Sequence, residues 1–416
     1  MNTYGVPVFI LVLLAGTYSG LAESAPSESL LVMNRPGSDV AQFRERLSRR
    51  GLEVLRESRC NTQRYSVFEV RPKRGTADAA LKALHAVKDA DLEAAERKFE
   101  SSVSACTPDI NDPKLHVEWQ LDAMNFGEMV CLLDAHGVKQ IERPRMTLID
   151  SGIVLIKKEL AKGQIREFNF TGGANGVEET TFSDESSIHH GTAVACVGAC
   201  TTNNRKSLAS AASFNKSVLI TMCRTSENDA IDTIDVIDAM NWCVDHQDLR
   251  GGRGVINLSI NSTAPPTYNG SSVVQAIAKA AAKQGDLFVN GAGNTNYHDE
   301  SAVTKNFRVV AGLEDTLLRW DEGPGIGSNY GAFKAAAPAV SVPLLNGTGK
   351  TVLYGTGTSF AAPCWASCIS LLMSLDPGLS APQADKIVFQ TATVTTEEYH
   401  LPDLRAAVNA ALALEP

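Results

Sequence analysis

Residues 354–374 read YGTGTSFAAPCWASCISLLMS, a glycine-rich turn followed by apolar residues at helical spacing. Pro363 is tolerated only in the first turn of a helix, so we expect the helix to begin near Ser359. A serine there faces free backbone N–H groups and the positive end of the helix dipole. This setting suits a nucleophile whose reaction generates an oxyanion, although a simple N-cap on a buried helix is an equal alternative.

The chain of 416 residues is long enough for one large domain and one small one. Hydrophobic residues make up 44% of it, which provides a sizeable core. The formal net charge of -9 argues against nucleic acid as the main partner.

Residues 1–22 are predicted to be a signal peptide. Val6–Gly16 is an apolar stretch too short to span a bilayer comfortably, and Gly20 and Ala22 supply small residues for cleavage. No Lys or Arg precedes this stretch, so an uncleaved anchor or a buried helix is the alternative. We expect secretion and, because no other segment looks apolar enough to cross a membrane, no membrane anchor after processing.

Nine cysteines become informative if the chain is secreted, because secretion permits disulfides. Cys60 stands alone in the N-terminal third, and an even eight suits a domain that loses its N-terminal piece. The eight are Cys106, Cys131, Cys196, Cys200, Cys223, Cys243, Cys364 and Cys368. Two pairs lie four residues apart on predicted helices, where one rigid turn suits a disulfide poorly, so we expect bridges between elements. Small buried thiols are the alternative.

The N-terminal part shows the order β-α-β-β-α-β of a ferredoxin-like split unit. Strands are expected at Ser29–Asn34, Leu52–Leu55, Tyr65–Val70 and Leu92–Phe99, with helices capped by Ser38 and Thr76. Residues 26–104 carry 15 Lys and Arg against 12 Asp and Glu, whereas residues 105–416 carry 23 against 34. A basic module beside an acidic one suggests docking, although solvated surfaces explain the difference about as well.

Ser101–Asp112 is polar and broken by prolines, so we interpret it as a linker. Beyond it, strands alternate with helices, the pattern of a parallel sheet covered on both faces. Strands are expected at Met146–Asp150, Val218–Cys223, Gly254–Ile260, Leu287–Asn290 and Arg308–Ala311, and helices at His190–Cys200, Ala230–Val244 and Ser271–Gln284. The predicted fold class is α/β, preceded by a small α+β domain.

Three short motifs accompany Ser359: DSG at Asp150, HGT at His190 and GAGN at Asn294. Each alone has an ordinary structural explanation, as a strand-ending Asp, a helix-capping His or a turn Asn. Together they are the groups of nucleophilic acyl transfer in an order, Asp, His, Ser, that occurs among catalytic triads.

In this interpretation Ser359 is the nucleophile, and His190 takes its proton and returns it to the leaving amine. Asp150 holds the imidazole tautomer and stabilises the imidazolium. Asn294 donates its side-chain amide to the oxyanion, together with the backbone N–H of Ser359.

The motifs resemble those of the subtilisin-like serine proteases, the subtilases, in precursor form. The matching segments are LIDSGI at Asp150, HGTAVA at His190, GVINLS ending at Ser259, AGN at Asn294 and GTSFAAP at Ser359. Asn111–Met124 resembles the start of the family's mature domain. In place of the second histidine that the family often has, this chain has Ala193, which is not a triad position.

The resemblance implies a secreted endopeptidase made as a zymogen. Residues 26–104 would be a propeptide that chaperones folding, inhibits the active site and is removed autocatalytically, with cleavage within Phe99–Asp109. Residues 105–416 would be the peptidase domain. Its partners would be protein or peptide substrates and its own propeptide, an intramolecular inhibitor.

The resemblance also implies a substrate pocket and raises the question of calcium. Ser259, Ile260 and Asn261 would line one wall, and Gly291, Ala292 and Gly293 the other; no acidic cluster lies there, so apolar or neutral residues should be preferred over dibasic sites. A calcium loop would correspond to Asn203–Leu208. Arg205 and Lys206 disfavour a cation there although Asn204 and Glu159 could supply oxygens, and catalysis should need no cofactor and no metal.

Six Asn-x-Ser/Thr sequences are candidate glycosylation sites: Asn169, Asn215, Asn257, Asn261, Asn269 and Asn346. Asn257 falls in a predicted core strand and should be unmodified. Two other functions stay open, a catalytically silent relative kept as a binding module and a transpeptidase or peptide ligase that uses the same acyl-enzyme.

Overall fold

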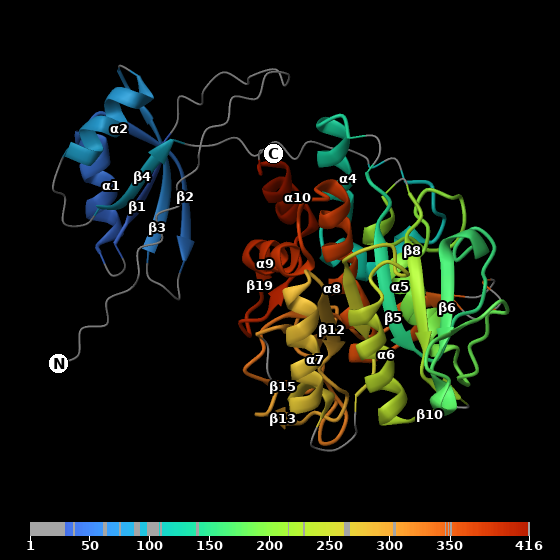
Figure 1. Cartoon of the computed structure of the whole chain (residues 1–416). Helices are drawn as coiled ribbons and strands as arrows, with labels where there is room; N and C mark the ends of the chain where they lie inside the picture. Colours follow the sequence, from blue (N-terminus) through green and yellow to red (C-terminus); the bar gives the residue numbers. More distant parts are fainter. Residues whose placement is uncertain are drawn as a thin grey trace. The chain divides into compact units, whose positions relative to one another are not determined.

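The structure, a computed structural model (Figure 1), describes residues 30–414 except 36–37, 61–64, 75, 87–91, 98–107, 109, 139–140, 215, 228, 262–266, 303–304, 346, 348 and 350–351. Contacts divide the chain into two units, Met1–Ala105 and Cys106–Pro416. The predicted signal peptide and nearly all of the predicted cleavage region lie outside the described residues.

The N-terminal unit has the predicted β-α-β-β-α-β order. Its elements are β1 Leu30–Asn34, α1 Val40–Arg49, β2 Leu52–Cys60, β3 Tyr65–Pro72, α2 Ala77–Ala86 and β4 Leu92–Arg97. The sheet is antiparallel with strand order β2-β3-β1-β4. Its small core includes Phe43 of α1 and Phe68 of β3, whose ring centroids lie 5.7 Å apart.

Of the two helix caps predicted for this unit, one is correct and the other is shifted by one residue. Thr76 caps α2 as expected, since its Oγ1 accepts from Ala79 N at 3.3 Å. Asp39 rather than Ser38 caps α1, because its Oδ1 accepts from Ala41 N at 2.9 Å. Ser38 and Asp39 both have side chains that can accept from the free N–H groups at the start of α1, and it is the carboxylate of Asp39 that does so.

The larger unit is built on an eight-stranded sheet of order β16-β14-β12-β11-β5-β8-β6-β7. All neighbouring pairs are parallel except β6 and β7. The strands are β5 Arg145–Asp150, β6 Ile165–Asn169, β7 Val177–Glu178, β8 Leu219–Arg224, β11 Val255–Leu258, β12 Leu287–Gly291, β14 Phe307–Leu313 and β16 Ala336–Pro338. All five strands predicted for this unit are present.

Eight α-helices accompany this sheet in the described residues: α3 Trp119–Ala123, α4 Phe126–Ala135, α5 His190–Ala199, α6 Thr233–Asp245, α7 Ser272–Lys283, α8 Thr358–Leu375, α9 Ala381–Thr391 and α10 Leu404–Leu412. Figure 1 shows α6 and α7 side by side on one face, whereas α5 and α8 pack against each other on the other. The layers therefore agree with a parallel sheet covered on both faces.

Short strands pair outside the main sheet. They are β9 Ser226–Glu227 with β10 Ala230–Ile231, β13 His298–Asp299 with β15 Tyr330–Gly331, β17 Val342–Leu345 with β18 Val352–Gly355, and β19 Thr393–Val394 with β20 His400–Leu401. The β9–β10 pair corrects the prediction that a helix begins at Ala230. Helix α6 begins at Thr233 instead, because Asp232 Oδ1 accepts from Ile234 N at 3.0 Å and caps it.

The order of the strands fixes where a ligand binds. The chain adds β8 and β6 on one side of β5 and adds β11, β12 and β14 on the other. In open α/β sheets, ligands bind beyond the carboxyl ends of the strands where the winding direction changes. This crevice therefore lies beyond the ends of β5 and β11, after Asp150 and Leu258.

Helix α8 begins where predicted, at Thr358, but its proline lies deeper than the first turn. Pro363 is the sixth residue of the helix. It lacks the N–H that would donate to the carbonyl of Ser359, four residues earlier. The hydroxyl of Ser259 fills this gap and donates to Ser359 O at 2.8 Å. The proline is tolerated because another element supplies the missing donor.

Helix α8 is also long and apolar enough to cross a membrane, contrary to the expectation that no segment beyond the N-terminus is. Its 18-residue apolar window is 83% buried inside the unit. It packs against β14, β12 and β11, so we interpret it as the central core helix of the unit.

The cysteines only partly follow the prediction. Cys196 and Cys200 form a disulfide, with Cα atoms 4.4 Å apart, although a bridge within one helical turn was not expected. The prediction was wrong because α5 ends at Ala199 and Cys200 already has extended backbone angles. Cys131 is also disulfide-bonded. Four further cysteines are buried thiols, Cys223, Cys243, Cys364 and Cys368, as in the alternative interpretation.

A buried ion pair lies directly before β12 and yields a stability prediction. Arg250 Nη2 donates to Asp286 Oδ2 at 2.7 Å, and the two side chains are 1% and 0% exposed. Asp286 Oδ1 also accepts from Gly254 N at 2.7 Å. Because Arg250→Met leaves a buried carboxylate without its cation, we expect unfolding free energy to fall by about 3–5 kcal/mol.

Urea unfolding in a Ser359→Ala background, which prevents self-digestion, measures this loss. Lys334→Met is the matched control, because Lys334 and Glu398 lie 3.9 Å apart with side chains 42% and 83% exposed. The control should lose less than about 1 kcal/mol. Equal losses in both variants would contradict the role of the buried pair.

Candidate active site

Asp150 ends β5 at the crevice and is 1% exposed. Its Oδ1 accepts from Ser151 N at 2.8 Å and from His190 Nδ1 at 2.7 Å. Its Oδ2 is buried and has no hydrogen-bond partner among the described residues. A buried carboxylate needs a compensating charge or donor, so this one favours a proton on His190 Nδ1.

His190 is the first residue of α5, and its side chain is 25% exposed. Burial lowers its pKa, but the charge of Asp150 and its hydrogen bond, with weaker effects of Asp184 and Asp229, outweigh burial and raise the pKa above the ordinary value. The imidazole is therefore oriented by Asp150 and more basic than a free histidine, as a general base requires.

Ser359 is half-buried in the first turn of α8, at the edge of the same hollow as His190. Its Oγ donates to Ser259 O at 3.4 Å. No hydrogen bond joins Ser359 to His190 in the described part of the chain. The structure thus brings the three predicted catalytic residues to one hollow but shows only the Asp150–His190 contact as formed.

Asn294 is exposed at the hollow, and its amide is oriented by the head of α8. Its Oδ1 accepts from both the backbone N–H and the hydroxyl of Thr358, each at 2.9 Å. With the oxygen held, the Nδ2 group is the part left to donate to a ligand, and among the described residues no hydrogen bond engages it. This arrangement is what an oxyanion donor needs.

The hollow has a volume of about 330 Å³, and five of the six predicted pocket residues line it. These are Ser259, Ile260, Asn261, Gly291 and Gly293. Ala292 does not, because it is 0% exposed and its N–H donates to Val310 O inside the sheet. Asn290 lines the hollow instead.

Two glycines are required where this wall meets α8. A Cβ on Gly291 would lie 2.6 Å from Thr358 O. Gly293 has φ +103°, and a Cβ there would lie 2.5 Å from Asn329 Nδ2. The absence of a side chain therefore lets the backbone approach the head of α8 at Gly291 and the side chain of Asn329 at Gly293.

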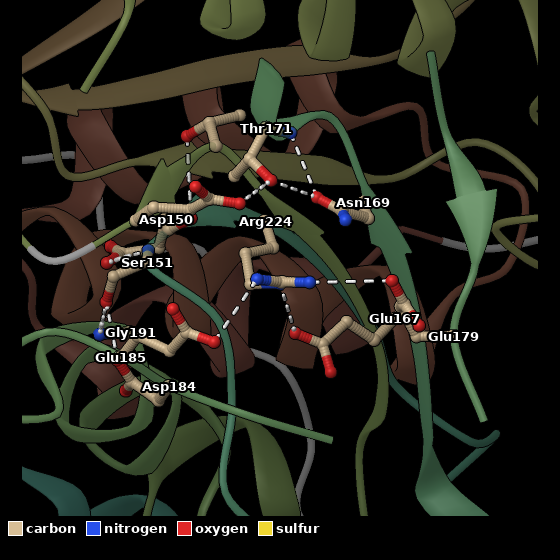
Figure 2. Close-up of polar contacts among 12 residues, drawn as sticks. Asp150, Ser151, Glu167, Asn169, Thr171, Glu179, Asp184, Glu185, Gly191 and Arg224 are labelled. Carbon is tan, nitrogen blue, oxygen red and sulfur yellow. Dashed lines mark hydrogen bonds and ion pairs between the residues drawn. The ribbon is translucent and has the colours of Figure 1, made fainter. Parts of the chain in front are cut away.

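The sequence interpretation missed Asp184, which lies beside the Asp150–His190 pair. This side chain is 5% exposed and accepts from the hydroxyls of Ser151 and Thr192 at 2.8 and 2.7 Å. Figure 2 shows Asp184, Ser151 and Gly191 converging below Asp150. In the sequence, Asp184 is one acidic residue in a polar stretch, six positions before His190. Nothing in that pattern distinguishes it from a solvated side chain.

Arg224 was also missed; it ends β8 opposite Asp150 in the sheet and is 7% exposed. Figure 2 shows three glutamates around its guanidinium, with Glu167 at 3.6 Å, Glu179 at 3.4 Å and Glu185 at 3.9 Å. Burial raises the pKa of Glu167 to about 8, despite the opposing effect of Arg224. The cluster supports the loop after Asp150, since a Cβ on Gly152 would lie 2.9 Å from Arg224 Cδ.

The loop that corresponds to a calcium site does not fit the cation. Asp112 accepts from the backbone N–H groups of Asn203 and Asn204, and Glu159 accepts from Ser207 N and Asn204 Nδ2. One buried oxygen of the described loop, Asn204 Oδ1, has no partner, whereas Ca²⁺ takes six to eight oxygens. Backbone donors hold the carboxylates that a cation would need. No acidic, histidine or cysteine cluster able to hold a metal occurs in the described residues.

Burial limits the candidate glycosylation sites. Asn257 is 0% exposed, as expected for a core strand. Asn269 is also 0% exposed, and its amide donates to Gly291 O at 3.2 Å, so it is not available in the folded unit either. Asn215 and Asn346 lie outside the described residues.

The fold and the arrangement of Asp, His and Ser are those of a subtilisin-like serine protease. A model of the family described as the subtilase family matches residues 144–405. Because the match covers more than half of the chain, the chain belongs to the subtilase family.

Two curated relatives agree with this assignment. A subtilisin-like protease of Coccidioides posadasii (strain C735) is 30% identical over 155 residues, 36% of each chain. A thermophilic serine proteinase of Bacillus sp. (strain AK1) is 27% identical over 235 residues, 55% of this chain and 52% of the relative. The matches span only about a third and about half of the relatives' lengths.

Solved structures support the fold alone. A protease from Pseudoalteromonas arctica PAMC 21717 has a TM-score of 0.58 at 21% identity and covers 74% of this chain and all of that one. The epidermin leader peptide processing serine protease of Staphylococcus aureus has a TM-score of 0.55 at 16% identity and covers 94% of this chain and all of that one.

The raised pKa of His190 is a measurable consequence of the geometry. In the Ser359→Ala protein, an NMR titration should place the imidazole pKa above the usual ~6.5. In Asp150→Asn the negative charge that most raises the pKa of His190 is gone, whereas burial still lowers it. The pKa of His190 should therefore fall below that of the parent. Identical titrations in both proteins would contradict the coupling of Asp150 to His190.

Proposed function

We propose that this protein is a serine endopeptidase that hydrolyses peptide bonds through an acyl-enzyme on Ser359. The observation that carries the proposal is the 2.7 Å contact between Asp150 and His190 at a hollow that also holds Ser359 and Asn294. Each of the four residues has the chemistry that one step of acyl transfer requires.

The reaction begins when the hydroxyl of Ser359 turns from Ser259 O toward Nε2 of His190. Substrate binding commonly tightens such contacts, which are loose in free enzymes. His190 accepts the proton as Ser359 Oγ bonds to the substrate carbonyl carbon. The imidazolium then gives that proton to the leaving amine, and Asp150 stabilises its charge without taking the proton. Water repeats the sequence to release the acid and regenerate Ser359.

The negative charge of the tetrahedral intermediate falls on the former carbonyl oxygen. Asn294 Nδ2 and the backbone N–H of Ser359 are the proposed donors to it. The Ser359 N–H belongs to the free first turn of α8, and the helix dipole adds a favourable field there. Fixed donors of this kind need no rearrangement as the charge develops.

We further propose that the protein is secreted as a zymogen. Residues 1–22 would direct secretion, and residues 26–104 would assist folding and inhibit the site until self-cleavage. The basic charge of residues 26–104 against the acidic residues 105–416 supports their association. The preferred residue before the scissile bond would be apolar or neutral, since the proposed pocket residues that line the hollow, among them Ser259, Ile260 and Gly291, carry no charge.

Calcium should be dispensable for stability. Because backbone N–H groups already satisfy Asp112 and Glu159, excess chelator should leave the melting temperature of the Ser359→Ala protein unchanged within 1–2 °C, roughly the effect of a few tenths of a kcal/mol. Thermal unfolding with and without added Ca²⁺ measures this. A large stabilisation by micromolar Ca²⁺ would refute the proposal.

Removal of the nucleophile tests the proposed activity. Ser359→Ala should abolish peptide hydrolysis and the release of residues 26–104, because both need the same acyl-enzyme. The measurement is electrophoresis and mass analysis of protein made in a host that lacks other proteases, with labelling of Ser359 by a fluorophosphonate in the parent. A mature-sized product from the variant would disprove self-processing.

The oxyanion role is tested separately. Asn294→Ala should lower kcat by about 10²–10³-fold, because one preorganised donor is lost while the nucleophile and base remain. Steady-state kinetics on a peptide substrate, with circular dichroism to verify folding, measures the loss. Asn296→Ala, at a neighbouring asparagine that bonds Asp321, is the control. A loss below threefold in Asn294→Ala would remove this residue from the oxyanion site.

A further inference from the structure

Asp184 is a buried carboxylate that the proposed mechanism does not use. It is 5% exposed, and no ion pair compensates it in the described part of the chain. Its neighbours are hydroxyl and backbone donors of three residues, Ser151, Ser186 and Thr192. A carboxylate is acceptor-only when ionised, so every group that contacts it must donate.

The three hydroxyls around Asp184 share one pattern. The hydroxyls of Ser151, Ser186 and Thr192 each donate to Asp184, at 2.8, 3.2 and 2.7 Å. Each hydroxyl has one proton, so each must then act as an acceptor toward its other neighbour. Asp184 thereby sets the direction of all three hydrogen-bonding chains.

The other ends of these chains are the catalytic segments. Ser151 Oγ accepts from Gly191 N at 2.9 Å, and Ser186 Oγ accepts from His190 N at 2.6 Å. Ser151 also donates its own N–H to Asp150 Oδ1 at 2.8 Å. These contacts connect Asp184 to both members of the Asp150–His190 pair through one intervening residue each.

The third chain and the backbone fix the same region. Thr192 Oγ1 accepts from Val154 N at 2.9 Å, which ties the first turn of α5 to the loop after Asp150. Asp184 and Gly152 form an isolated antiparallel bridge. A Cβ on Gly191 would lie 2.2 Å from Gly152 O, so the two segments are already in close contact. Small rotations here would displace His190 from Asp150.

We propose that Asp184 is a positioning residue that orients the hydroxyls of Ser151, Ser186 and Thr192 and so holds His190 in register with Asp150. The inference deepens the proposed peptidase function and rests on it for its kinetic consequences. It assigns no chemical step to Asp184, which has no direct contact with the ring of His190.

The near-isosteric variant Asp184→Asn tests the direction of these bonds. One carboxylate oxygen of Asp184 accepts from Ser151 and Ser186, and the other accepts from the N–H and the hydroxyl of Thr192. In the variant one of these oxygens becomes an amide NH₂ group, which donates and therefore cannot accept from its set of partners. We expect kcat to fall at least about 10-fold with KM changed less than threefold, because misalignment affects the chemical step rather than binding. The acid limb of kcat/KM should move to lower pH, since Asp184 is one of the carboxylates, with Asp150 and Asp229, that raise the pKa of His190.

Glu185→Gln is the matched control. It removes one negative charge from the next residue, which is exposed and contacts Arg224 rather than the hydroxyls. It should change kcat less than threefold. An Asp184→Asn enzyme within threefold of the parent in kcat would overturn the inference, as would an equal loss in Glu185→Gln, which would make the effect one of charge alone.

Two further measurements keep the inference testable if Asp184→Asn does not fold or if the parent proves inactive. Ser151→Ala removes a single chain and should lower kcat, whereas Thr192→Ser keeps its hydroxyl and should not. In the Ser359→Ala background, the downfield proton NMR signal of His190 Nδ1–H should weaken or shift in Ser151→Ala and persist in Thr192→Ser. An unchanged signal in Ser151→Ala overturns the positioning role whether or not the parent hydrolyses peptides.

Discussion

A hydrogen bond of 2.7 Å between Asp150 and His190 joins residues forty positions apart, and it requires the end of β5 and the start of α5 to meet. The carboxylate is buried at the end of a strand, where ionisation is costly without donors. The sheet brings the end of β5 to the crevice, and α5 begins at the histidine itself. The result is a histidine of raised pKa at the hollow that also holds Ser359.

Much of this could be predicted from sequence because the signals were local. Alternating strands and helices gave the parallel sheet, and glycine-rich turns around Asn294 and Ser359 marked the residues at strand and helix ends. Asp184 and Arg224 could not be predicted, because their importance depends on which hydroxyls and glutamates the fold places around them. Ala292 was misplaced because a motif gives a stretch of residues but not the direction in which each one points.

The departures from prediction have a common physical origin at the ends of elements. Cys200 can bridge to Cys196 because it has left the helix, and α6 starts late because Ala230 and Ile231 pair with β9 and Asp232 caps the helix after them. In the loop beside Asp112, backbone N–H groups occupy the carboxylates that a cation would otherwise neutralise. Sequence patterns identify the middles of elements well, whereas hydrogen-bond competition decides their ends.

Pro363 has a consequence for how evolution can change this site. By leaving the carbonyl of Ser359 without an internal donor, it makes Ser259, which lines the same hollow, part of the support of Ser359. Under the proposed function, substrate recognition and support of the nucleophile both involve Ser259, so a change at this residue affects both. Under the proposed function, changes in the accepted substrate are therefore easier at Ile260, whose side chain has no such bond, than at Ser259 or at Asn261, whose amide donates to Ala292 O.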